Sequence, residues 1–244
     1  MKKRTLHLCT FAVACGATAA GAAAGGTTAT GRHAGGTPPL PPTSSFSARV
    51  DNQWYPLEPG TRYVYTGVKD GKPSRDVLTV THQTKTIDGV PCVVVHDRLY
   101  LRGRLGEQTT DWYSQDSNRN VWYFGEETAE LDARGHVTST AGTWTAGVNG
   151  AQPGIYMPAS PRVGQAGRQE FYKGQAEDHF KVIGRFDTAT APHVANALLT
   201  QEWTPLEPGV LDHKLYVRGI GTVLEQTEKG GNERNELVSV TKGA

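Results

Sequence analysis

The stretch DWYSQDSNRNVWYFGEE, residues 111–127, decides the fold. Two short aromatic runs, at 112–113 and 121–124, flank the polar segment 116–120. Aromatic and β-branched residues suit a pleated sheet surface, and a cluster of Asp, Asn and Ser forms its own local turn hydrogen bonds. The stretch therefore predicts a β-hairpin.

Both strands of this hairpin carry aromatic residues at adjacent positions. Neighbouring side chains on a strand point to opposite faces of the sheet, so these rings cannot all enter one core. We expect the remaining rings, beside the acids of the hairpin, to form a ligand-binding surface. The candidate ligand-binding residues are Trp112, Tyr113, Trp122, Tyr123, Asp116 and Glu127.

Outside the hairpin, strand-like runs follow one another at short spacing, separated by turn residues. Asp70-Gly71 and Asp88-Gly89 are dipeptides that tolerate the positive φ of tight hairpin turns. A meander of this length must curl to cover its apolar face. We predict an all-β fold: a single curved, mostly antiparallel sheet, a half-barrel or barrel-like meander, after a disordered N-terminal tether. The predicted strands are 61–68, 75–87, 90–101, 108–115, 120–126, 136–145, 168–172, 177–186, 198–204, 213–217, 221–228 and 233–241.

The composition is sufficient for one hydrophobic core, and the net charge gives information about the class of partner. The chain has 244 residues, is 37% hydrophobic and has a formal net charge of +1. This near-neutral charge gives no electrostatic reason to expect nucleic acid or an anionic membrane surface as a partner. The 29 Gly and 14 Pro punctuate the chain, as a turn-rich β protein requires.

The N-terminal region has the pattern of an export signal. Residues 2–4 are basic, and 6–14 form an apolar run too short to span a bilayer of roughly 30 Å. We expect an export signal at 1–24, a flexible Gly/Ala/Thr/Pro linker at 25–45, and a single β domain at 46–244. The protein is therefore expected outside the cytoplasm, either extracellular or in the cell envelope.

The cysteines fit this location. The segment 12–15, AVAC, is similar to a bacterial lipobox, so Cys15 is a possible lipid anchor and the one expected link to a membrane. Cys92 is the only cysteine of the predicted domain, so no internal disulfide forms. Because Cys92 lies in an apolar strand, we expect a buried, unreactive thiol.

No metal or cofactor motif is present. The chain has no His-x-His, His-Glu-x-x-His or paired-Cys pattern, and we expect neither a metal site nor a cofactor. Asp116, Asn118, Asn120 and Glu127 follow the spacing of an EF-hand loop, but Val121 stands where the sharp turn needs Gly. A hairpin turn is favoured over a calcium loop at 116–120.

Catalytic chemistry has only carboxylates and histidines to draw on, because Gly-x-Ser-x-Gly and Ser-x-x-Lys are both absent. Glycoside cleavage needs two facing carboxylates, and a lyase needs a base beside a neutralised acid. His96 beside Asp97, and His213 beside Asp212, cannot form simple dyads on a strand. The candidate catalytic residues are Asp111, Glu126, Glu170, Glu177, His96 and His213.

Several segments resemble a group of exported bacterial proteins and lipoproteins. They include PLEPGTRYVY (56–65), DWYSQD (111–116), NVWYFGEE (120–127) and WTPLEPG (203–209). In addition, LYVRGIGTV (215–223) is similar to the YapGvGlV element of half-barrel-like extracytoplasmic β families. The resemblance implies an extracytoplasmic location and a half-barrel fold. It implies no catalytic residue, because no activity is established for the group.

Two functions remain open. The first is an exported ligand-binding or envelope-associated protein whose partner is a small-molecule, lipid or glycan ligand, such as an acyl or glycan group. The alternative is a secreted polysaccharide hydrolase or lyase that uses paired carboxylates. An enzyme requires acids and a His converging in one cleft with perturbed pKa values, whereas a lipid binder requires a deep apolar cavity with few charges.

Overall fold

The computed structural model describes residues 38–187 and 196–243. The predicted export signal, the Cys15 anchor and most of the predicted linker lie outside the described residues. A single 3-10 turn, η1 (Thr43–Ser45), precedes the first strand. The strands are β1 (Phe46–Ser47), β2 (Arg62–Lys69), β3 (Lys72–Ile87), β4 (Val90–Leu101), β5 (Arg104–Asp116), β6 (Val121–Leu131), β7 (Val137–Ser139), β8 (Trp144–Thr145), β9 (Gln152–Met157), β10 (Ala166–Arg168), β11 (Glu170–Phe171), β12 (His179–Phe186), β13 (Ala197–Trp203), β14 (Leu211–Val217), β15 (Gly221–Lys229) and β16 (Arg234–Thr241).

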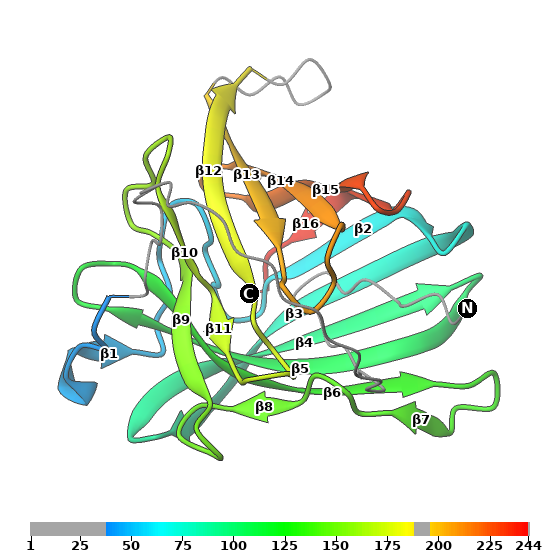
Figure 1. The fold of residues 1–244 in the computed structure, drawn as a ribbon. Coiled ribbons are helices and arrows are strands. Elements are labelled where there is room, and N and C mark those ends of the chain that lie inside the picture. The colour runs from blue at the N-terminus through cyan, green and yellow to red at the C-terminus, as the bar shows by residue number, and fades with distance from the viewer. Residues whose placement is uncertain (1–37, 188–195, 244) are drawn as a thin grey trace, which may run out of the picture.

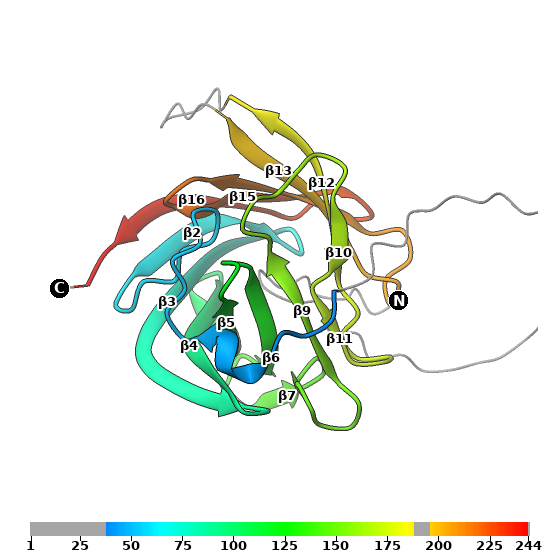
Figure 2. The ribbon, with the colours of Figure 1, turned by 90° about the vertical axis from the view of Figure 1, so that its left-hand side faces the viewer.

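These strands form one antiparallel sheet that curls on itself (Figures 1 and 2). The order along the sheet is β10-β12-β13-β14-β15-β16-β2-β3-β4-β5-β6-β9-β11, so the last strand pairs with β2 and most other neighbours are consecutive in sequence. The two ends approach each other, where Arg168 Nη2 donates to Gln152 Oε1 at 2.9 Å. The predicted all-β, curved antiparallel fold is confirmed, as a nearly closed barrel.

Tight turns explain why the long central hairpins keep their register. Asp70 and Gly71 have φ of 51° and 67°, and Asp88 and Gly89 have φ of 48° and 77°. Positive φ at both central residues gives a turn whose twist matches that of the flanking strands. The two predicted Asp-Gly turns are confirmed, and β4 has the bounds that the sequence predicts.

Two strand predictions were wrong in detail, and two strands, β1 and β9, were not predicted. The predicted strand 136–145 is interrupted, because Gly142 adopts a φ of 99° and a turn separates β7 from β8. The predicted strand 168–172 is divided between β10 and β11. Strand β9 contains Pro153 and Gly154, two residue types that weaken a strand pattern. Gly154 is required there, since a Cβ would lie 2.3 Å from the Arg168 carbonyl oxygen.

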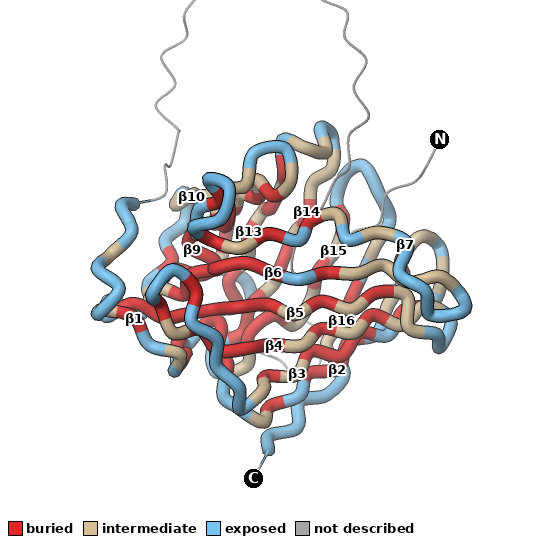
Figure 3. The backbone as a smooth tube through the Cα atoms, turned by 90° about the horizontal axis from the view of Figure 1, so that it is seen from below, coloured by how far each residue is buried: buried red, intermediate tan, exposed pale blue. Residues whose placement is uncertain are grey.

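Near its turn the β5–β6 hairpin is buried on both faces: residues 111–116 and 121–126 are all buried, and these strands are largely red in Figure 3. Tyr113 and Tyr123 pair across the hairpin and stack at 4.7 Å inside the barrel. On the outer face, β1 pairs with β5 and covers the neighbouring rings. The Phe46 ring lies 5.9 Å from that of Trp122 and 5.5 Å from that of Phe124. The predicted hairpin therefore forms, with core on one side and a covering strand on the other.

Candidate functional site

The inner face of the hairpin carries a pair of carboxylates directly opposite each other. Asp111 on β5 and Glu126 on β6 are partners in the register, and both are fully buried. The Tyr123 hydroxyl donates to Asp111 Oδ1 at 2.7 Å. Glu127, one residue further along, points the other way and is exposed. The period of two thus sends one of two adjacent glutamates into the barrel.

The same inward face carries carboxylates on most other strands of the barrel. Register partners include Glu202 with Asp212 and Lys214 with Glu225, so these side chains share a face. We call this buried set the interior carboxylates; it comprises Asp76, Asp97, Glu107, Asp111, Glu126, Glu170, Asp178, Glu202, Asp212 and Glu225. Among the described residues, the buried lysines are Lys69 and Lys214.

On β3 to β5, crowding of like charges accompanies burial. Burial raises the pKa of Asp76 well above its ordinary value, and the neighbouring Asp97 raises it further. Burial likewise raises the pKa of Asp111, with Asp97 as the second cause and the Tyr123 hydrogen bond opposing the rise. Both effects disfavour the ionised form. Protonation of these carboxyls therefore reduces the electrostatic repulsion in this region of the barrel.

A second group surrounds Glu170 on β11. Burial raises the pKa of Glu170 well above its ordinary value, and the carboxylates of Asp178 and Glu126 raise it further. The nearby Trp144 indole lowers the pKa of Glu170, but neither carboxyl oxygen of Glu170 nor Trp144 Nε1 has a partner in good hydrogen-bond geometry. Such unsatisfied buried groups are rare and call for an explanation.

A third group is built around Lys214 on β14. Its Nζ lies 2.9 Å from Glu202 Oε2 and 3.6 Å from Glu225 Oε1. Glu202 also accepts hydrogen bonds from Thr200 Oγ1 at 2.8 Å and from the Tyr216 hydroxyl at 3.1 Å. Burial raises the pKa of Glu225 to about 8, although Lys214 opposes the rise.

Lys69 connects the third group with the first. Its Nζ lies 3.8 Å from Glu107 Oε2, and its charge lowers the pKa of both Asp76 and Glu225. Glu170 connects in turn to the first group, because the charge of Asp111 raises its pKa. The interior carboxylates therefore form one continuous electrostatic network.

The structure divides the sequence-predicted residues between the two faces. Asp111, Glu126, Glu170, Tyr113 and Tyr123 meet inside the barrel. The others do not join them. His96, Glu127 and His213 are half-buried or exposed, each next to an inward-facing residue of its strand. Trp112 is covered by Lys85, and Trp122 is covered by Phe46. Glu177 accepts a hydrogen bond from Gly174 N at 2.7 Å.

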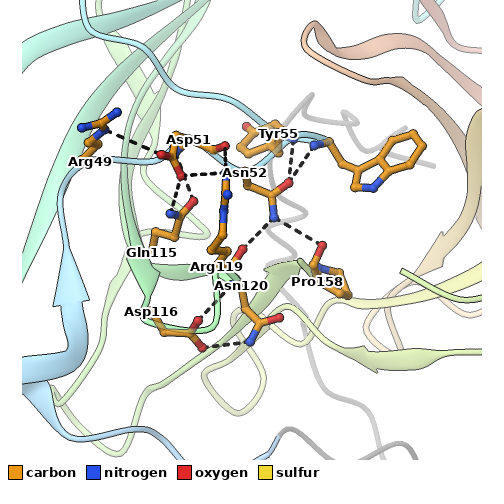
Figure 4. A network of polar contacts seen from close by, with 10 residues as sticks. Arg49, Asp51, Asn52, Tyr55, Gln115, Asp116, Arg119, Asn120 and Pro158 are labelled. Carbon is orange, nitrogen blue, oxygen red and sulfur yellow. Dashed lines mark hydrogen bonds and ion pairs between the residues drawn. The ribbon is translucent and has the colours of Figure 1, made fainter. Parts of the chain in front are cut away.

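Asp116 organises the turn between β5 and β6. Its oxygens accept hydrogen bonds from Asn120 N, Asn120 Nδ2 and Trp122 Nε1, each at 2.9 Å. Asn52 ties the same turn to Pro158, as the network in Figure 4 shows. The hairpin-turn interpretation of 116–120 is thereby supported over the calcium loop. Within the described ranges, no group of three or more His, Cys, Asp or Glu side chains is placed to hold a metal ion.

Sequence reasoning missed several interior carboxylates, together with both lysines. The missed groups are Asp76, Asp97, Glu107, Asp178, Glu202, Asp212, Glu225, Lys69 and Lys214. Period-two alternation gives only part of this information: Glu107 and Asp111 share the phase of Tyr113 along β5, but the pattern does not say which phase lies inside. Cys92 behaves as expected: it is buried, and burial raises the pKa of its thiol to about 12.

The raised pKa values predict that the protein loses stability as pH rises. Burial raises the pKa of Asp212 from 3.8 to about 6 and that of Glu225 from 4.5 to about 8. The folded protein binds more protons than the unfolded chain between these values, so the free energy of unfolding falls from about pH 4 to about pH 8. One pKa unit corresponds to about 1.4 kcal/mol, so the fall amounts to several kcal/mol.

Thermal unfolding followed by circular dichroism across this pH range measures the effect. Glu225→Gln should flatten the upper part of the profile, whereas the exposed Glu127→Gln should leave it unchanged. A melting temperature that is constant or rises from about pH 5 to about pH 8 would contradict the assignment.

Comparisons with known proteins reach only distant similarities. No protein-family model matches the chain, and no curated protein is similar to it. A Bacteroides fragilis protein described as exported, with a YMCC-like fold, has 15% identity and a TM-score of 0.45, covering 78% of this chain and 100% of its own. A protein of Parabacteroides distasonis described as a lipoprotein has 10% identity and a TM-score of 0.41 over the same shares. Within residues 38–187 and 196–243, no helix is long and apolar enough to cross a membrane.

Proposed function

We propose that this chain is an exported or cell-envelope protein that binds a polar small molecule, such as a glycan, through the interior carboxylates. The location is supported by the basic residues 2–4 followed by the short apolar run 6–14. The observation that carries the binding proposal is the convergence of buried carboxylates from eight strands of one barrel, together with Asp178 beside β12, onto its inner face.

Polar ligands fit this interior better than acyl chains do. A buried polar group without a hydrogen bond costs free energy, and an apolar chain cannot supply the missing partner. No donor lies in good hydrogen-bond geometry at either oxygen of Glu170 or of Asp212, although the nearby side chains of Trp144 and Thr227 lower their pKa values. Hydroxyl or amine donors of a ligand would satisfy them. We therefore favour a glycan or other donor-rich ligand over an acyl group.

Carboxylate-based hydrolysis is the second candidate, favoured by one specific contrast. Glu202 accepts hydrogen bonds from Thr200 and Tyr216 and pairs with Lys214. Glu225, on the other side of the same lysine, has its pKa raised by burial to about 8. Glycoside cleavage needs two carboxyls held close together in different surroundings, one of them with a raised pKa so that it can act as the acid.

Histidine chemistry finds no support in the barrel interior. His96 and His213 lie on the opposite face of their strands from Asp97 and Asp212. His179 stacks on Trp203 at 5.6 Å between ring centroids. The candidate hydrolase would therefore use carboxylates alone. It predicts release of reducing ends from a polysaccharide panel, lost in both Glu202→Gln and Glu225→Gln.

Thermal-shift screening of the full chain tests the binding proposal. The panel should contain neutral oligosaccharides, amino sugars, polyamines and fatty acids. We expect a polar member to raise the melting temperature, since a ligand at 100 times its Kd stabilises by about 2.7 kcal/mol. Glu126→Gln should remove the shift, whereas the adjacent, outward-facing Glu127→Gln should retain it. A shift given only by fatty acids, or one that survives Glu126→Gln, would contradict the proposal.

A further inference from the structure

We infer that the ligand carries a protonated amine, bound at Glu170 beside the rings of Trp144 and Tyr123. This inference rests on the proposed function and specifies its ligand class. We call the site the amine site; it consists of Glu170, Glu126, Asp178, Trp144 and Tyr123.

The first argument is the distribution of the buried cations. Lys69 lies next to Glu107, and Lys214 lies between Glu202 and Glu225. At Glu170 the charges that act most strongly are all negative, those of Asp178, Glu126 and Asp111. A buried charge is stable only when it is paired or neutralised. A cation supplied by a ligand would compensate the negative charge around Glu170, as Lys69 and Lys214 do for the carboxylates next to them.

The second argument is that Glu170 can accept more hydrogen bonds than the protein supplies. It is fully buried, and no donor lies in good hydrogen-bond geometry at either of its carboxyl oxygens, although the nearby Trp144 indole lowers its pKa. An ammonium group has several N–H donors and can bond more than one oxygen at once. Hydrogen bonds between ionised groups are roughly twice as strong as neutral ones, so an amine would bind there more tightly than a hydroxyl.

The third argument is the aromatic wall of the site. The rings of Tyr123 and Trp144 meet edge to face at 5.4 Å, and Tyr113 stacks on Tyr123. Aromatic rings attract cations through the negative face of their π-system, and ammonium ligands are commonly bound in such aromatic surroundings. The barrel already holds one ammonium in this way, because Lys214 Nζ lies 5.9 Å from the Tyr156 ring centroid.

An organic amine fits the site better than a divalent metal ion. Calcium takes six to eight oxygen ligands, and its usual protein sites gather several carboxylates within a few ångströms. Among the residues that the structure describes, no group of three metal-ligating side chains has the required spacing. The rings of Trp144 and Tyr123 also supply no metal ligand. Carboxylates beside aromatic rings are the surroundings of an alkylammonium group.

Calorimetric titration of the full chain with defined amines tests the inference. The probes are spermidine, the trimer of glucosamine and, as its neutral counterpart, the trimer of N-acetylglucosamine. We expect spermidine or the glucosamine trimer to bind at least tenfold more tightly than the neutral trimer. Glu170→Gln removes one charge at nearly constant volume and should weaken amine binding about tenfold or more. Glu177→Gln, which alters a half-buried turn residue of the same region, should not change it.

Proton release gives a second readout. Glu170 must ionise to pair with an amine, and its pKa is raised, so amine binding should tighten as pH rises and should release protons to the buffer. Asp178, Glu126, Asp111 and Trp144 face Glu170 and take part in this linkage. If Glu170→Gln does not fold, Glu126→Gln supplies the same comparison.

The outcomes separate this inference from the proposed function. Equal binding of the two sugar trimers, or amine binding that Glu170→Gln and Glu126→Gln leave intact, would overturn the amine site while the binding function stands. Glu170-dependent binding of calcium without binding of any amine would overturn it as well. If no polar member of the panel binds, both the inference and the proposed function fail.

Discussion

Lys214→Met is expected to lower the free energy of unfolding by roughly 3–5 kcal/mol, the cost of breaking a buried ion pair on one side. Lys214 is 3% exposed, and its Nζ stands between the carboxylates of Glu202 and Glu225 at 2.9 Å and 3.6 Å. Without it, Glu202 loses its buried cationic partner, and Glu225 loses the charge that opposes the rise of its pKa. Urea unfolding at neutral pH, followed by far-UV circular dichroism, measures the loss.

Two further variants separate the charge effect from the loss of a long side chain. Lys181→Met removes an exposed lysine from β12 and should change stability by less than about 1 kcal/mol. Adding Glu225→Gln to Lys214→Met removes the second carboxyl that Lys214 contacts and should recover part of the loss. Because protonation neutralises Glu225, the cost of Lys214→Met should also shrink as pH falls through about 8. Wild-type stability of Lys214→Met at neutral pH would contradict the ion-pair network.

Strand positions could be predicted from local sequence because turns and alternation are local properties. The Asp88-Gly89 turn fixes the start of β4, and the bounds 90–101 follow. The limits appear where long-range packing overrides local preference. Pro153 and Gly154 are poor strand residues, but β9 forms because it pairs with β6 and β11 and lies close to the Arg168 backbone. No local pattern carries that information.

The interior carboxylates could not be placed for a different reason. Alternation in a strand gives the phase of the side chains, and the usual rule then assigns polar residues to solvent. By that rule Asp76 and Asp97 face outward, yet both are buried. Only closure of the sheet decides which phase lies inside. Asp111 and Glu126 were selected as candidates because they belong to the predicted hairpin. Their positions gave no information about Glu107 or Glu225.

The net charge of the chain also gives no sign that acidic side chains are concentrated inside the barrel. The overall charge of +1 is an average over the whole chain. Because the barrel interior gathers many carboxylates with only Lys69 and Lys214 as buried lysines among the described residues, the remainder of the chain carries an excess of Lys and Arg. A near-neutral sequence therefore contains a strongly acidic interior. Composition alone does not reveal this division, which depends on how each strand faces the barrel.

Trp122→Ala is expected to destabilise the protein by about 3–5 kcal/mol, the usual cost of truncating a large aromatic in a core. The side chain is 1% exposed and packs against Phe46 of β1. Its indole also donates to Asp116 Oδ2 at 2.9 Å, so truncation removes one of the bonds that hold the hairpin turn. Urea unfolding of the full chain checks the prediction. Trp122→Phe keeps the ring contact and loses the hydrogen bond, so it should cost less.

Trp203→Ala serves as the matched control, because Trp203 is half-buried and stacks on His179 outside the aromatic core. It should cost clearly less than Trp122→Ala, since less apolar surface leaves water there on folding. The same pair of variants tests the ligand-surface hypothesis for the hairpin rings. If Trp122→Ala folded with wild-type stability and lost ligand binding, its ring would be a ligand contact and the packing between β1 and the hairpin would contribute little.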